Sequence, residues 1–266
     1  MLYFRMILTM LVSLYTSRVV LNVLGVSDYG IYNVVGGFVT MLAYLNSVFV
    51  DSTQRFISFA LGESNLQKLK KVFCTSLTIH ISLSIIIMII AETFGLWFIN
   101  VKLNIDPGRM VAANWVYQCS ILSLLITIIN IPYRSCIVAH EHMHIYAYFS
   151  IIEVILKLVI VFFILAIPAD KLIVYSILYL LVSVVIPLCY MIYCKKKFEE
   201  CTFNIEFDKP MLKEMFSYAK WVMVGNLGFS FKDQVSNVML NMFLGTLINA
   251  ARGITMQVNG IVSSFA

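Results

Sequence analysis

The chain has 266 residues, of which 61% are hydrophobic and only 12% are charged, and its mean hydropathy is +0.89. A water-soluble domain cannot hide so much apolar surface, so the composition excludes that class and indicates a membrane-embedded chain. The net charge of +5 does not indicate nucleic-acid binding, because the basic residues cluster between long apolar stretches, as in the cytoplasmic loops of membrane proteins.

Long apolar stretches predict about eight membrane-spanning helices, since each span needs about 20 residues. This pattern predicts an all-α fold, a polytopic transmembrane helical bundle. The first stretch follows a single charge, Arg5, and has no convincing cleavage site, so we interpret it as a retained helix rather than a signal peptide. In chain order the stretches are 4–25, 30–60, 72–99, 111–138, 145–167, 171–194, 216–245 and 249 onward.

The longest polar stretch divides these predicted helices into two groups. We predict a first bundle of six helices at 1–194, a cytoplasmic linker at 195–215, and the start of a second bundle at 216–266, with helix 7 and part of helix 8. The Leu-Asn, Gly and Gly-Ile pattern of 21–37 returns in 240–260 with a four-residue offset, which is typical of repeated transporter halves. The alternative is that small residues recur in any membrane helix. The last apolar stretch has run for about 17 residues at Ala266, so we expect a fragment of a longer protein.

The distribution of basic residues predicts the orientation of the chain. With the amino terminus in the cytoplasm, twelve of the 19 Lys and Arg residues lie on the cytoplasmic side, and three, Lys102, Arg109 and Lys171, lie outside. Positive residues favour the cytoplasmic side, so we predict a cytoplasmic amino terminus.

Charged groups within the spans are the candidate site residues, because each costs at least about 2.5 to 3.5 kcal/mol at a helix centre unless it meets a cavity or a partner. Arg18 and Asn22 lie one turn apart and form a polar stripe; the alternative is that Arg18 reaches the outer headgroups. Glu153 and Lys157 share a helix face and can pair, in a role that is either structural or part of a cavity lining.

Two further cations belong to the predicted second bundle. Lys232 and Asp233 are adjacent and point about 100° apart, so one faces the cavity and the other a neighbouring helix. Arg252 begins the eighth helix, where an interfacial anchor is the alternative to substrate binding. The predicted substrate-binding residues are Arg18, Asn22, Glu153, Lys157, Lys232 and Arg252.

Two patterns that bear on metal binding are weaker. His140 to His144 fits H-E-x-x-H, which on a helix holds the zinc of a protease. It falls at a predicted helix–loop junction without a third ligand motif, so we interpret it as a cytoplasmic loop whose histidines titrate near neutral pH. The six cysteines form no CxxC pair and predict neither disulfides nor a zinc site. We therefore predict no metal, no cofactor and no catalytic residue.

Five separated blocks carry a family resemblance. They are LYTSRVVLNVLGVSDYGIYNVVGGFVTML (14–42), TQRFISFALGE (53–63), AHEHM (139–143), YAYFSIIEVILKL (146–158) and NAARGITMQVNG (249–260). Together, in their order and their positions between helices, they resemble polysaccharide biosynthesis proteins of the oligosaccharide flippase family, relatives of multidrug and toxin extrusion transporters.

The resemblance implies two helical bundles that face each other across a central cavity and alternate between inward-open and outward-open shapes. It implies a multi-pass protein of the inner (plasma) membrane that moves an undecaprenyl-diphosphate-linked oligosaccharide for surface polysaccharide assembly. The implied partners are that lipid-linked oligosaccharide, membrane lipids and other polysaccharide assembly proteins, with no nucleic acid.

Two other function classes stay open. A cation-coupled multidrug exporter needs an acidic site in the membrane, for which Glu92, Glu153 and Asp233 are the candidates. A membrane enzyme would be either a zinc protease that uses His140 and His144 or a polysaccharide polymerase.

Overall fold

The computed structural model describes residues 2–102, 105–165, 169–202 and 208–222, and these fold into helices with no strand among them. The predicted all-α helical bundle is confirmed. The bounds of the elements are α1 (Leu2–Gly62), α2 (Leu66–Ile90), the π-helical turns η1 (Ala91–Gly95) and η2 (Phe98–Lys102), the 3-10 turn η3 (Pro107–Arg109), α3 (Met110–Ile129), α4 (Ile131–Ala139), α5 (Met143–Leu165) and α6 (Lys171–Lys197).

The chain divides into two compact units, Met1–Met215 and Phe216–Ala266. The first unit contains all the elements listed above, and the second is described over residues 216–222, which are helical. The predicted domain limits and the internal repeat stay predictions, since the second half of that repeat lies outside the described residues.

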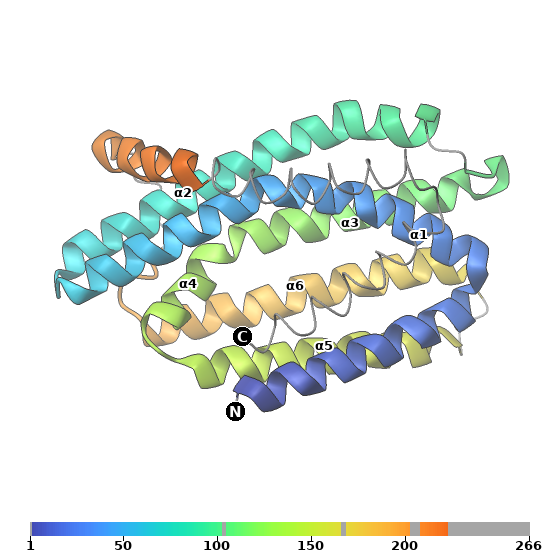
Figure 1. Cartoon of the computed structure of the whole chain (residues 1–266), viewed down its shortest axis with the longest axis horizontal. Coiled ribbons are helices and arrows are strands. Elements are labelled where there is room, and N and C mark those ends of the chain that lie inside the picture. Colours follow the sequence, from blue (N-terminus) through green and yellow to red (C-terminus); the bar gives the residue numbers. More distant parts are fainter. Residues whose placement is uncertain (1, 103–104, 166–168, 203–207, 223–266) are drawn as a thin grey trace, which may run out of the picture. The chain divides into compact units, whose positions relative to one another are not determined.

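Helix α1 consists of two limbs that meet at Gly25. The backbone of Gly25 has φ 80 and ψ 167, a conformation that a residue without Cβ adopts readily. The chain reverses direction there, and Figure 1 shows the two limbs in blue, with the first limb beside α5. The break falls between the first two apolar stretches of the sequence, 4–25 and 30–60.

Polar side chains fix the starts of the later helices. Asn65 precedes α2 and its side chain accepts a hydrogen bond from the backbone N–H of Lys68 at 3.0 Å. Asp170 precedes α6 and accepts from the backbone N–H of Leu172 at 3.0 Å. Between α3 and α4 the helix is interrupted at Asn130, and Pro132 follows in the first turn of α4, where a missing N–H is tolerated.

The interruption of α2 by π-helical turns coincides with a side chain from α3. The hydroxyl of Tyr117 donates a hydrogen bond to the carbonyl of Ala91 at 2.8 Å. A side chain that occupies a carbonyl of the helix ladder is a recognised cause of such irregular turns. Gly95 makes room for the ring, because a Cβ at that position would overlap the Tyr117 hydroxyl.

Five stretches among the described residues are long and apolar enough to cross a membrane. Many large apolar side chains are exposed on them, such as Ile89, Val111, Phe163 and Leu181. Outward-facing apolar residues of this kind suit contact with lipid. The stretches are Met6–Gly25, Leu66–Val101, Pro107–Ala139, Met143–Leu165 and Lys171–Lys197.

Candidate functional site

A salt bridge lies within α5, near the middle of a 23-residue candidate span. The ammonium nitrogen Nζ of Lys157 is 2.6 Å from Oε1 of Glu153, one helical turn earlier. Their side chains are 27% and 37% exposed, so neither is sealed in the core. Because an unpaired ion would be costly at this depth, the contact stabilises both charges in the membrane.

The same ammonium group contacts an aromatic cluster from two other helices. Lys157 Nζ lies 4.8 Å from the ring centroid of Tyr179 on α6. One turn earlier on α6, Tyr175 lies 6.1 Å from Tyr179 and meets Tyr32 of α1 edge-to-face at 5.1 Å. A cation over ring faces, beside a carboxylate, offers both stacking surfaces and hydrogen-bonding groups.

A second cation, Arg134, contacts tyrosine rings nearer the carboxyl end of α6. Arg134 of α4 is half-buried, and its Nη2 donates a hydrogen bond to the hydroxyl of Tyr146 at 3.0 Å. Its guanidinium carbon lies 5.2 Å from the Tyr146 ring and 5.7 Å from the Tyr190 ring. Tyr190 in turn packs edge-to-face on Phe149 at 4.7 Å.

The residues around Lys157 and those around Arg134 both lie along α5 and α6. Tyr179 and Tyr190 are eleven residues apart, which is three helical turns, so they share a face of α6 about 16 Å apart. We call this set the polar seam: Tyr32, Arg134, Tyr146, Glu153, Lys157, Tyr175, Tyr179 and Tyr190.

Sequence reasoning missed part of the polar seam. Arg134 is not among the predicted site residues, and the structure places it inside α4 against two tyrosine rings. The signal that could have found the tyrosines is their spacing, since Tyr175, Tyr179 and Tyr190 fall on one face of a single helix.

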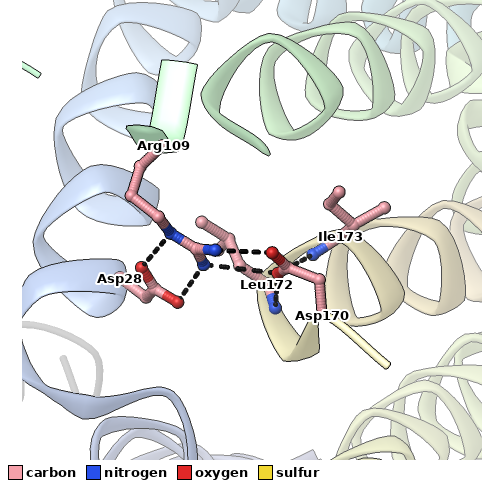
Figure 2. A network of polar contacts seen from close by, with 5 residues as sticks. All are labelled: Asp28, Arg109, Asp170, Leu172 and Ile173. Carbon is pink, nitrogen blue, oxygen red and sulfur yellow. Dashed lines mark hydrogen bonds and ion pairs between the residues drawn. The ribbon is translucent and has the colours of Figure 1, made fainter. Parts of the chain in front are cut away.

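At the opposite end of the unit, one arginine joins three helices. Figure 2 shows Arg109, just before α3, between Asp28 of α1 and Asp170 at the start of α6. Its Nε donates to Oδ1 of Asp28 at 2.9 Å, and its Nη2 donates to the other oxygen. Its Nη1 donates to Oδ2 of Asp170 at 2.5 Å. The planar guanidinium therefore holds two carboxylates in fixed positions.

The Arg109 network lies where the sequence predicts the outward-facing side. Burial raises the pKa of Asp170, but hydrogen bonds from Arg109 and from the backbone N–H groups of Ile173 and Leu172 lower it further, so the net pKa lies below the usual value of 3.8. Asp170 is therefore an anion that caps α6 and binds Arg109 at the same time. This arrangement joins the start of the second limb of α1 to the starts of α3 and α6.

The other predicted site residues are not part of the polar seam as described. Arg18 and Asn22 are exposed on the first limb of α1, and neither has a hydrogen-bond or ion-pair partner among the residues that the structure describes. Lys232 and Arg252 lie outside the described residues. Substrate binding by these four residues stays a prediction.

The H-E-x-x-H segment forms a turn between α4 and α5. His140 follows the last residue of α4, and Glu141 has a left-handed backbone with φ 59. His140 Nε2 lies 2.5 Å from the carboxylate of Glu200, and His142 Nδ1 lies 2.8 Å from the hydroxyl of Tyr193. A zinc protease needs this motif on a continuous helix, which the described structure does not provide.

The helices and their polar seam define a multi-pass helical membrane protein. A family model described as polysaccharide biosynthesis protein matches residues 2–266. The chain therefore belongs to the polysaccharide biosynthesis protein family, and the predicted family resemblance is confirmed. No curated protein and no solved structure matched the chain significantly.

Proposed function

We propose that this protein moves an undecaprenyl-diphosphate-linked oligosaccharide from the cytoplasmic to the outer leaflet of the plasma membrane for surface polysaccharide assembly. It acts as a transporter rather than an enzyme, by alternating access, with its amino terminus in the cytoplasm. Membership of the polysaccharide biosynthesis family supports the proposal. The observation that carries it is the position of Lys157, which contacts both a carboxylate and an aromatic ring inside a membrane span.

The salt bridge supplies a way to bind an anion within the membrane. In the absence of substrate, Glu153 neutralises Lys157 at 2.6 Å and limits the cost of burying the charge. A diphosphate oxygen can take the place of the Glu153 carboxylate on the ammonium group, which has three donor hydrogens. The ion pair therefore exchanges partners during the transport cycle, and the ammonium is never left without an anion.

The tyrosines supply the contacts for the sugars. Ring faces such as that of Tyr179 stack on the apolar faces of sugar rings, and the phenol hydroxyls exchange hydrogen bonds with sugar hydroxyls. Arg134 adds a second cation, which contacts Tyr190, and by the rise of α6 Tyr190 lies about 16 Å from the Tyr179 that Lys157 contacts. An extended, polar substrate with one anionic end suits this spacing of groups.

The main alternative is a cation-coupled drug exporter, which needs an acidic group that accepts a proton or a sodium ion. Among the described residues, Glu153 is paired with Lys157, and Glu92 accepts a hydrogen bond from Gln118 at 3.2 Å. Each of these two carboxylates has a polar partner, so neither is an unpartnered acidic group. This observation favours the flippase over the exporter.

The test uses a strain that lacks the full-length gene and any related flippase gene. The wild-type gene should restore surface polysaccharide, and so should Lys171→Met, which removes an exposed lysine at the start of α6. Lys157→Met should not restore it, and the lipid-linked intermediate should accumulate on the cytoplasmic leaflet. The double variant Glu153→Gln/Lys157→Met leaves no unpaired charge and should be equally inactive at wild-type expression.

Two results would refute the proposal. Normal polysaccharide in the strain without the gene would show that the protein has no part in its assembly. Drug resistance that depends on the gene and on an ion gradient would instead support the exporter.

A further inference from the structure

Three cysteines from different parts of the chain converge beside the base of α4 and α6. Cys136 belongs to α4, Cys194 to the last turn of α6, and Cys201 to the loop after α6. All three are buried, with exposed fractions of 0%, 0% and 3%. The adjacent Glu200 is also buried, at 3%. Glu200 is paired with His140, and its carboxylate lies beside the thiols of Cys136 and Cys201.

The donor atoms of this cluster are close enough to share one ion. The sulfur atoms of Cys136 and Cys201 and a carboxylate oxygen of Glu200 all lie within 4.8 Å of one another. A zinc ion with bonds of about 2.3 Å to sulfur places tetrahedral sulfur ligands about 3.8 Å apart. The thiol of Cys194 is buried nearby and donates a hydrogen bond to the backbone carbonyl of Tyr133 at 3.3 Å. Cys136, Cys201 and Glu200 therefore supply three donors of a tetrahedral site, and Cys194 can add a third sulfur once its thiol turns away from Tyr133.

A neighbouring histidine holds the carboxylate in place. His140 Nε2 lies 2.5 Å from Oε1 of Glu200, and its ring stacks on Phe198 with the centroids 4.1 Å apart. Metal-binding carboxylates commonly have such an outer hydrogen-bond partner, which fixes their orientation. Stacking on Phe198 fixes the imidazole itself.

A cavity of about 310 Å³ leads to this cluster. Its lining includes His140 and Glu200, together with residues from the end of α1 and the start of α2. Glu200 is therefore both a wall of the cavity and a neighbour of the buried sulfurs.

We propose that Cys136, Cys194, Cys201 and Glu200 bind one zinc ion. Thiolate ligands around a tetrahedral position are typical of structural zinc sites, and carboxylate oxygens also bind zinc. The cysteines form no CxxC pair, so the sequence predicts no such site, but the fold brings distant residues together. The ion fixes the loop at 198–202 to α4 and α6, at the start of the predicted inter-bundle linker. A disulfide would join only two of the three sulfurs and would not use the neighbouring carboxylate, and all three cysteines are free.

The test measures the metal content of the purified full-length protein by mass spectrometry. Wild-type protein should contain about one zinc ion per chain. Cys136→Ala and Cys201→Ala should lose it, and His140→Ala should lower the zinc affinity about 10- to 100-fold. Cys119→Ala is the matched control, because Cys119 is also buried in the first unit but belongs to α3. It should retain the ion.

A second measurement tests zinc binding on wild-type protein, in case the alanine variants do not fold. Wild-type protein from cells grown with cobalt in place of zinc should show the thiolate-to-cobalt charge-transfer absorption of a tetrahedral site. Addition of a chelator should make Cys136, Cys194 and Cys201 newly reactive to alkylation, whereas the buried Cys74 and Cys119 should react no faster than before. The proposal would be overturned if wild-type protein contained no zinc as purified and showed no such absorption after growth with cobalt. Equal zinc content in wild type and in a folded Cys201→Ala variant would also overturn it.

Discussion

Lys157 of α5 and Tyr179 of α6 meet in a cation–π contact of 4.8 Å, and the same ammonium group binds Glu153 at 2.6 Å. A single side chain thus joins two spanning helices and neutralises a carboxylate one turn away on its own helix. The polar seam therefore keeps two charged side chains within a membrane span, where each is stabilised by its partners.

The ring of Tyr179 should matter more than its hydroxyl. Tyr179→Phe retains a ring face for Lys157, whereas Tyr179→Ala removes a contact worth about 0.5 to 2 kcal/mol. We expect Tyr179→Ala to lower the transport rate about 2- to 30-fold, and Tyr179→Phe to change it by less than about threefold. Tyr148→Ala, at an exposed tyrosine of α5, is the control. Equal losses of transport rate in Tyr179→Phe and Tyr179→Ala would contradict a role for the ring contact with Lys157.

The packing of Gly95 against Tyr117 makes a prediction about stability. Gly95→Ala places a methyl group on the Tyr117 hydroxyl, and overpacking of this kind costs about 1 to 3 kcal/mol. The melting temperature in detergent should fall accordingly. Adding Tyr117→Phe removes the overlapping oxygen and should restore part of the loss. Gly30→Ala, which meets no atom within 4 Å, should have little effect; an equal fall in Gly30→Ala would contradict this packing argument.

The Arg109 network should depend on the shape of the guanidinium as well as on its charge. Arg109→Ala leaves two carboxylates facing each other and should destabilise the protein by about 1 to 3 kcal/mol, between the values for exposed and buried pairs. Arg109→Lys should recover only part of this, because an ammonium cannot bind both carboxylates in the same way. Thermal unfolding measures both, with Lys171→Ala as the control at the same end of α6. If Arg109→Lys had the full stability of the wild type, the positive charge alone would account for the contribution of Arg109.

Asp170 predicts the direction of an acid effect on stability. Its pKa is lower in the folded protein than in the unfolded chain, so its contribution is fully present above about pH 4 and is lost as the pH falls through the lowered folded-state pKa. Asp170→Asn keeps a residue that caps helices well but removes this titration. The melting temperature of wild type should therefore fall more steeply with acid than that of Asp170→Asn. Parallel curves for the two proteins would count against the network.

The features that the sequence predicted best are local ones. Apolar stretches of span length predicted the helical bundle, and the spacing of Glu153 and Lys157 placed both on one helix face because four residues make about one turn. Gly25 marks the limit between two predicted helices, and its backbone conformation there is one that glycine favours.

The features that escaped prediction join residues far apart in the chain. Arg109 is 81 residues from Asp28 and 61 from Asp170, so no periodicity connects them. The thiol cluster likewise combines Cys136 with Cys201, and the spacing of cysteines in the sequence gives no signal of it. Helix packing decides both arrangements, and a single sequence shows which helices exist more readily than which of them meet.

Transport of a lipid-linked oligosaccharide by the purified full-length protein in lipid vesicles would test the central claim most directly. Vesicles that contain wild-type protein should move the labelled oligosaccharide lipid between leaflets, as measured by its accessibility to an added glycosidase, and vesicles with Lys157→Met should not. If wild-type vesicles give the same accessibility as protein-free vesicles in both the presence and the absence of ion gradients, the protein is not a flippase for this class of lipid.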